Sequence, residues 1–123
     1  MEKIEVRQGG LNWAVIECNG DFRISGRVLG RFEINGDVRL SGSIVGRIDV
    51  DGTIRKSGSI IGRIEKDGTL RKGGGIYGRI ENDGTIRKGG MIWGLFSPHG
   101  GGYTAQAAVT ALLVFFAPQY WGA

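Results

Sequence analysis

Three pairs of basic residues recur at sixteen-residue intervals and could bind anions. Guanidinium and ammonium groups hold phosphate and carboxylate oxygens through charge-assisted hydrogen bonds. The net charge of +4 has the same sign and favours acidic partners such as phospholipid headgroups or nucleic acid. Solvated strand surface with diagonal ion pairs is the competing interpretation. The candidate anion- or lipid-binding residues are Arg55, Lys56, Arg71, Lys72, Arg87 and Lys88.

A second set of candidates is a ring of apolar residues, one in each repeat. Strict strand alternation turns these side chains outward, beside the basic pairs, and aromatic residues mixed with basic ones are typical of a membrane interface. Two alternatives stay open: a β-bulge at the following residue turns them inward, or they form a homo-oligomer contact. Only this ring could stack on bases, so nucleic acid is the weakest candidate partner. Its members are Trp13, Leu29, Val45, Ile61, Tyr77 and Trp93.

No arrangement of residues in the sequence indicates catalysis. His99 is the only histidine, and without a second ligand it predicts no metal site. Cys18 has no histidine base nearby in the sequence, so we interpret it as an inert thiol. The segment 49–52 lacks the later glutamate of a calcium loop and is better interpreted as a turn. We therefore expect a non-enzymatic protein with no cofactor and no metal.

The elements that must position these residues are repeats of sixteen residues. Within each unit, two short strands flank a three-residue loop ending in glycine, such as Val50-Asp51-Gly52. This loop places Ile48 opposite Ile54 across the hairpin. The units begin at Gly10, Gly26, Gly42, Gly58 and Gly74, with half-units before the first and from Gly90.

The link between units, Lys56-Ser57-Gly58, is expected to be a loop of the same kind, which sets Ile54 opposite Ile60. One face of every hairpin is then apolar. The same register sets Arg47 opposite Arg55, and such like-charged pairs destabilise a sheet unless diagonal acids or a bound anion neutralise them. Arg63 and Arg71 face each other in the same way, as do Arg79 and Arg87. The expected inward residues are Ile44, Ile48, Ile54, Ile60, Ile64, Leu70, Ile76, Ile80, Ile86 and Ile92.

We expect a mainly β fold: a closed antiparallel barrel of about 12 short strands with a C-terminal apolar helix as its central plug. Half-units at both ends allow the first and last strands to pair and remove exposed edges. Residues 104–117 are apolar on nearly every side, which indicates burial all round. A β-solenoid is the alternative. The inward ring that leaves room for the plug is Ala14, Gly30, Gly46, Gly62, Gly78 and Gly94.

We expect a single domain over 1–123, with the barrel at 2–97, a linker at 98–103 and the helix at 104–117. The N-terminal residues lack the apolar segment of a secretory signal, so a cytoplasmic address, with a peripheral membrane location as an option, is expected. The apolar part of the tail is shorter than the roughly 20 residues that span a bilayer.

The repeats resemble the β-flower proteins, in particular the five-fold β-flower type. The motif is an aliphatic residue, Gly, any residue and Ile, then Asp-Gly, any residue, an aliphatic residue and Arg. It stands here at 61–64 and 67–71, and again between Tyr77 and Arg87. The resemblance implies a barrel related in shape to Tubby C-terminal domains, which wrap a helix and bind phosphoinositides. The unit containing Trp13 departs from the motif, with Asn12 and Ala14 in place of Ile and Gly.

Two functions follow as expectations. The first is a non-enzymatic binding or scaffold module that contacts anionic lipid through a basic, aromatic-bearing rim. The alternative is a structural protein that self-assembles, either as an oligomer or as a polymer similar to bactofilins.

Overall fold

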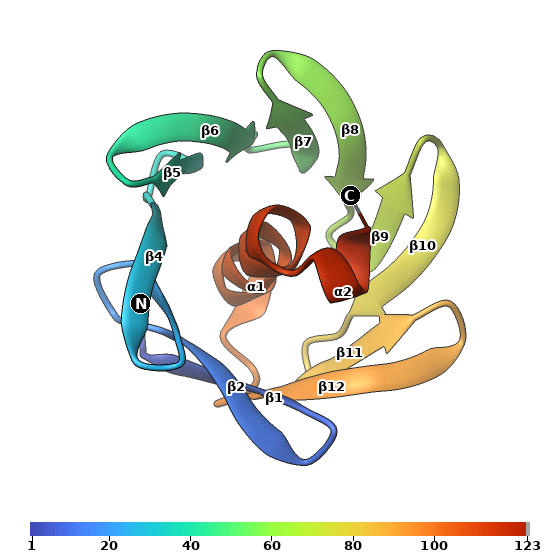
Figure 1. Cartoon of the computed structure of the whole chain (residues 1–123). Helices are drawn as coiled ribbons and strands as arrows, with labels where there is room; N and C mark the ends of the chain where they lie inside the picture. The colour runs from blue at the N-terminus through green and yellow to red at the C-terminus, as the bar shows by residue number, and fades with distance from the viewer. Residues whose placement is uncertain (123) are drawn as a thin grey trace.

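The chain folds as a closed barrel of twelve antiparallel strands around a central helix (Figure 1). The computed structural model describes residues 1–122. The first and last strands pair with each other, so the predicted plugged barrel is confirmed and the β-solenoid alternative is wrong. The elements are β1 (Ile4–Gln8), β2 (Leu11–Ile16), β3 (Asp21–Ile24), β4 (Arg27–Phe32), β5 (Asp37–Leu40), β6 (Ser43–Ile48), β7 (Thr53–Lys56), β8 (Ser59–Ile64), β9 (Thr69–Lys72), β10 (Gly75–Ile80), β11 (Thr85–Lys88), β12 (Met91–Ser97), α1 (Gly102–Phe116) and α2 (Pro118–Trp121).

The loops at one end of the barrel have the predicted three-residue form. Between β6 and β7, the N–H of Asp49 donates to the carbonyl oxygen of Thr53 at 2.8 Å and leaves residues 50–52 as the loop. Gly52 has a φ of 94°, which glycine adopts at little cost. Ile48 lies opposite Ile54, as predicted. We call this end, formed by loops 18–20, 34–36, 50–52, 66–68 and 82–84 and their flanking carboxylates, the acidic pole.

The links at the opposite end are two-residue turns, so the predicted three-residue link is wrong. Ser57 and Gly58 have φ values of 52° and 85°, and Lys56 pairs directly with Ser59. Left-handed conformations at both central residues define the turn type whose twist matches that of the flanking strands. We call this end the cationic pole; it comprises the turns 9–10, 25–26, 41–42, 57–58, 73–74 and 89–90, the strand ends beside them, and residues 112–122.

A β-bulge follows each of these turns and reverses the expected sidedness of the strand. Ile54 pairs with Gly62, but the next pair is Arg55 with Ile60, so Ile61 is an extra residue without a partner. The predicted pairing of Ile54 with Ile60 is therefore wrong. Corresponding register shifts occur in all six long strands, because each needs to bend away from the barrel axis near its turn.

Helix α1 occupies the centre of the ring in Figure 1, and its residues 105–114 are all buried. Aromatic side chains at the end of α1 and in α2 pack against glycines of the predicted ring. A Cβ atom at Gly46 would lie 2.3 Å from the ring of Phe115, and one at Gly62 would lie 3.0 Å from the ring of Trp121. Four glycines thus act as sockets, each for one aromatic side chain: Gly30 for Phe116, Gly46 for Phe115, Gly62 for Trp121 and Gly78 for Tyr120.

Two buried polar side chains of the plug are satisfied by the barrel wall and by the helix itself, whereas the buried hydroxyl of Tyr103 has no hydrogen-bond partner among the described residues. Asn82 caps the start of α1, because its side-chain oxygen accepts the N–H of Gly102 at 3.1 Å. Inside the barrel, Gln106 donates to the carbonyl oxygen of Ile80 at 2.8 Å, and Thr110 donates to that of Gln106 at 2.7 Å. The helix begins two residues before the expected position, and α2 was not predicted.

Candidate functional site: the cationic pole

Among the described residues, the cationic pole has no acidic side chain. All twelve Asp and Glu residues of the chain lie outside the strand ends 8–12, 24–28, 40–44, 56–60, 72–76 and 88–92 and outside residues 112–122. The same segments carry Arg27, Lys56, Lys72 and Lys88, all of which are exposed. Charged side chains are therefore sorted along the barrel axis, and those of the described residues at this end are all cationic.

The arginines of the three basic pairs are neutralised by acids on the neighbouring strand end. Arg55 contacts Asp49 at 2.8 Å, and equivalent contacts of 3.1 and 2.7 Å join Arg71 to Glu65 and Arg87 to Glu81. The predicted arginine-to-arginine register is confirmed. Of the two expected ways to neutralise these like-charged pairs, diagonal acids or a bound anion, the structure shows the diagonal acids. With arginines about one-third to two-fifths exposed, each pair contributes about 0–1 kcal/mol.

The lysines of the same pairs lie at the pole itself, and α2 holds two of them. Lys72 donates to the carbonyl oxygen of Trp121, and its ammonium nitrogen lies 4.8 Å from the centre of the Trp121 ring and 5.0 Å from that of Tyr77. Lys88 donates to the carbonyl oxygen of Gln119 at 3.2 Å. Cations are favourable at these carbonyls because the C-terminal end of a helix carries partial negative charge.

The apolar ring lies on the inner side of the wall, as the bulge alternative required, and the outward orientation is wrong. Trp13, Val45, Ile61, Tyr77 and Trp93 pack against the core, and Leu29 is half-buried. The aromatic members continue into the plug through edge-to-face contacts, which link Trp13 to Trp93, Trp93 to Tyr120, and Tyr120 to Tyr77. Their hydroxyl groups are satisfied: Tyr77 donates to the carbonyl oxygen of Tyr120, and Tyr120 to that of Arg87.

The bulge brings a different set of apolar residues to the surface. Four isoleucines that were expected inside are more than half exposed, because each now shares the outer face with an arginine of the adjacent strand. The predicted inward position is wrong for these four and correct for the other six residues of that face. In the sequence, two consecutive apolar residues before a glycine were the available signal for these exposed positions. The exposed residues of this kind are Val28, Ile44, Ile60, Ile76 and Ile92.

A groove opens at the cationic pole between β8, the turn after β9, and the end of the plug. Its volume is about 600 Å³. Lys56 and Lys72 provide its charge, and apolar side chains provide its walls. The wall residues are Ile61, Val114, Phe115, Pro118 and Trp121.

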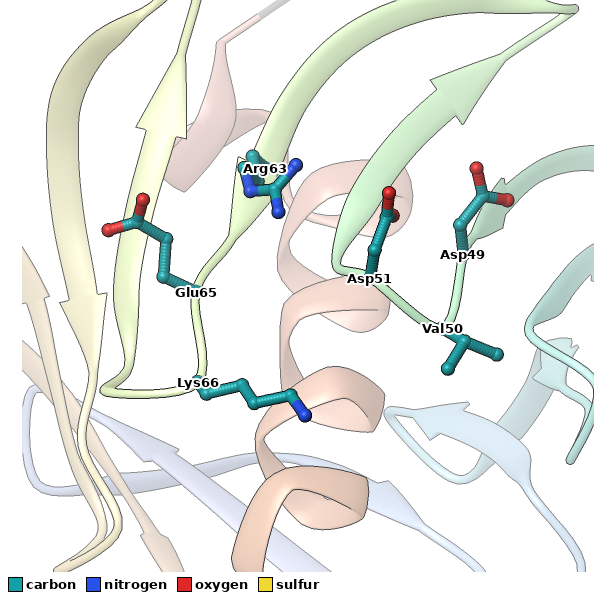
Figure 2. Close-up of a pocket in the computed structure, with 6 residues that line it drawn as sticks. All are labelled: Asp49, Val50, Asp51, Arg63, Glu65 and Lys66. Atoms are coloured by element: carbon teal, nitrogen blue, oxygen red, sulfur yellow. The ribbon is translucent and has the colours of Figure 1, made fainter.

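A cleft at the acidic pole has a mixed charge. Figure 2 shows Arg63 between Asp51 and Glu65, with Lys66 on the loop below it; the cleft measures about 670 Å³. Backbone and side-chain hydrogen bonds from Thr53, ahead of the charge of Arg63, lower the pKa of Asp51. In residues 1–122, no group of three or more His, Cys, Asp and Glu side chains could hold a metal ion. Asp51 accepts the N–H of Thr53 at 3.0 Å, as expected of a turn.

Within the described part of the chain, neither helix is long and apolar enough to cross a membrane. Cys18 and His99 are both exposed. Comparison of the chain with protein-family models, with curated proteins and with solved structures gave no match, so the cationic pole has to be interpreted from its own chemistry.

Proposed function

We propose that this protein is a non-enzymatic module that binds anionic membrane surfaces through its cationic pole. The observation that carries the proposal is the combination, among the described residues, of exposed aliphatic side chains with lysines and no acidic side chain. Insertion of apolar side chains into the headgroup region and attraction to anionic lipid are the two contributions that hold peripheral proteins on bilayers. The insertion residues are then the outer aliphatics rather than the aromatic ring.

The six turns are the parts that would touch the bilayer. In Figure 1 the hairpins spread outward towards these turns. Each of the exposed aliphatics lies two residues after the last residue of a turn. An insertion depth of roughly 5–10 Å would bury them. Lys56, beside Ile60 at one such tip, would remain at the level of the headgroups because long basic side chains extend toward water.

Vesicle flotation tests the proposal. We expect binding to vesicles containing phosphatidylserine, weak binding to phosphatidylcholine alone, and a decrease with rising salt. Lys56→Glu with Lys88→Glu should reduce binding at least tenfold, since each basic residue near such a surface contributes about 1 kcal/mol. Lys66→Glu at the acidic pole is the matched control and should leave binding unchanged. Equal binding to neutral and anionic vesicles would contradict the proposal.

The β-flower resemblance belongs to the same proposal. The closed barrel, its hairpin repeats and its central helix support it. It implies a lipid-related role by analogy with Tubby-like domains, and analogy of fold is weaker support than the chemistry of a site.

Self-association is the second candidate. The exposed isoleucines on the outer face and the oppositely charged poles favour contact between copies. Small-angle scattering over a range of concentrations tests it: Ile60→Ser with Ile76→Ser should shift an associating protein toward the monomer, and a concentration-independent monomeric size in the unmodified protein rules association out.

A further inference from the structure

We infer that the groove at the cationic pole binds one amphiphilic anion, a molecule with a single apolar chain and a carboxylate or phosphate head. The inference rests on the proposed function, because the groove opens on the pole that would meet the bilayer. The inference adds a defined site for one molecule to a surface that would otherwise bind lipid without specificity.

The size and walls of the groove suit a small amphiphile. Its volume of about 600 Å³ lies within the range of roughly 300–1,000 Å³ typical of small-molecule sites. The apolar wall joins the barrel to the plug: Ile61 comes from β8, Phe115 from the last turn of α1, and Trp121 from α2. An alkyl chain along this wall would remove apolar surface from water, which favours binding.

The charge at the groove fixes the sign of the head. Of residues 1–122, Lys56 and Lys72 line it, and no acidic side chain does. Lys72 is held in place by the carbonyl oxygen and ring of Trp121, and an ammonium group with three donors retains two for a ligand after that bond. A carboxylate or phosphate head fits these donors, whereas a quaternary ammonium head does not.

The groove lies in the sector where Ile61 stands between Phe115 and Trp121 of the plug. On one side, β10 and β12 carry Tyr77 and Trp93, which contact Tyr120 edge to face, and Figure 1 shows α2 lying toward β9 and β10. On the other side, β6 carries Val45, and Phe115 packs against the adjacent Gly46. At the equivalent place in β8 stands Ile61, which leaves the space beside Phe115 uncovered. A tryptophan at position 61 would fill this space, and the barrel already accommodates tryptophan at equivalent positions of β2 and β12.

Calorimetric titration with monomeric probes below their micelle concentrations tests the inference. We expect saturable binding of one dodecyl phosphate or one dodecanoate per chain, and no binding of dodecyltrimethylammonium or of inorganic phosphate alone. Ile61→Trp should abolish binding by filling the groove. Lys72→Met should weaken it about tenfold, the scale of one charge-assisted hydrogen bond.

Two control variants separate the groove from general effects. Leu29→Trp makes the same kind of change in a different hairpin, and Lys66→Met removes a lysine from the acidic pole; both should bind as the unmodified protein does. Thermal unfolding checks that every variant folds. Equal binding of the cationic amphiphile, or unchanged affinity in both Ile61→Trp and Lys72→Met, overturns the inference.

The two proposals fail separately. Binding to phosphatidylserine vesicles without binding of monomeric probes removes only the groove inference. Binding of monomers without binding to vesicles removes the membrane function and leaves the groove as a site for a free amphiphile. Loss of vesicle binding in Ile61→Trp as well would show that the single bound lipid anchors the protein.

Discussion

The residue before the glycine in each loop of the acidic pole accepts a hydrogen bond from the backbone N–H two positions later. Asp51 accepts from Thr53 at 3.0 Å, and this bond is the first cause of its lowered pKa. Asp67 and Asp83 have lowered pKa values for the same reason. Two other loops make the bond with an amide oxygen instead, from Asn19 and Asn35. The same hydrogen bond is therefore made by a titratable carboxylate in three loops and by a neutral amide in two.

We predict that stability falls in acid partly through these three aspartates. A carboxyl whose pKa is lowered on folding stabilises the fold above its unfolded value, here near 3.8, and this stability is lost as pH falls through the lower folded value. Asp51→Asn, Asp67→Asn and Asp83→Asn together should therefore flatten the decline of Tm below pH 4. Thermal unfolding from pH 2 to 7 measures this. An unchanged slope would show that other carboxylates dominate.

At the scale of elements, the loops and the repeat were predictable, whereas the direction of the strand ends was not. Glycine after aspartate marks the three-residue loop directly in the sequence. The bulge at Ile61 has only an ambiguous signal, two aliphatic residues before a glycine, and either Ile60 or Ile61 could face inward. Tertiary structure decides between them: the strand has to bend away from the axis while Gly62 stays against Trp121. The candidate lysines were identified from the sequence, but the exposed isoleucines and the groove required the structure.

The short helix α2 was missed for a related reason. Tyr120 and Trp121 follow a proline that ends the apolar run, so the sequence alone reads as a tail after the plug. In the structure Tyr120 is completely buried, and burial raises its pKa above the ordinary tyrosine value. Sockets in the wall therefore order a segment that has weak helical propensity of its own.

We predict that the fit of Phe115 into its socket is measurable as coupling. A methyl group at Gly46 would lie 2.3 Å from the Phe115 ring, so Gly46→Ala should destabilise the fold by about 1–3 kcal/mol, as overpacking does. Phe115→Leu should recover part of that loss, which gives a positive coupling energy in a double-mutant cycle. Ala14 shows that the wall accepts a methyl group at an equivalent position. Strict additivity of the two changes in urea unfolding would contradict the socket.

For the whole molecule, closure and charge sorting act together. The pairing of Val6 with Phe96 joins the two ends of the sheet, so no strand of the barrel has a free edge. Helix α1 begins at the acidic pole and ends at the cationic pole, where Lys88 contacts a carbonyl oxygen of the following α2, so the helix dipoles and the charges of the wall are complementary. The distribution of charge thus favours one direction of the plug over the reverse.

We predict that removal of residues 1–8 converts the barrel into an associating protein. Without β1, strands β2 and β12 become edges with unpaired backbone groups, which readily pair with another chain. Size-exclusion chromatography with light scattering should show dimers or larger species, against a matched deletion of residues 1–3, which precede the sheet. A monomer with unchanged Tm would mean that closure contributes little.

The glycine sockets also bear on how an array of copies can surround something that does not repeat. Neighbouring units are nearly identical, yet each meets a different side chain of the plug. A glycine specifies none of these partners, because it contributes a vacant space instead of a complementary shape. A newly duplicated repeat would therefore accommodate any aromatic side chain of the plug that faced it. Tandem duplication could add hairpins to the barrel before the sequence of the plug had changed.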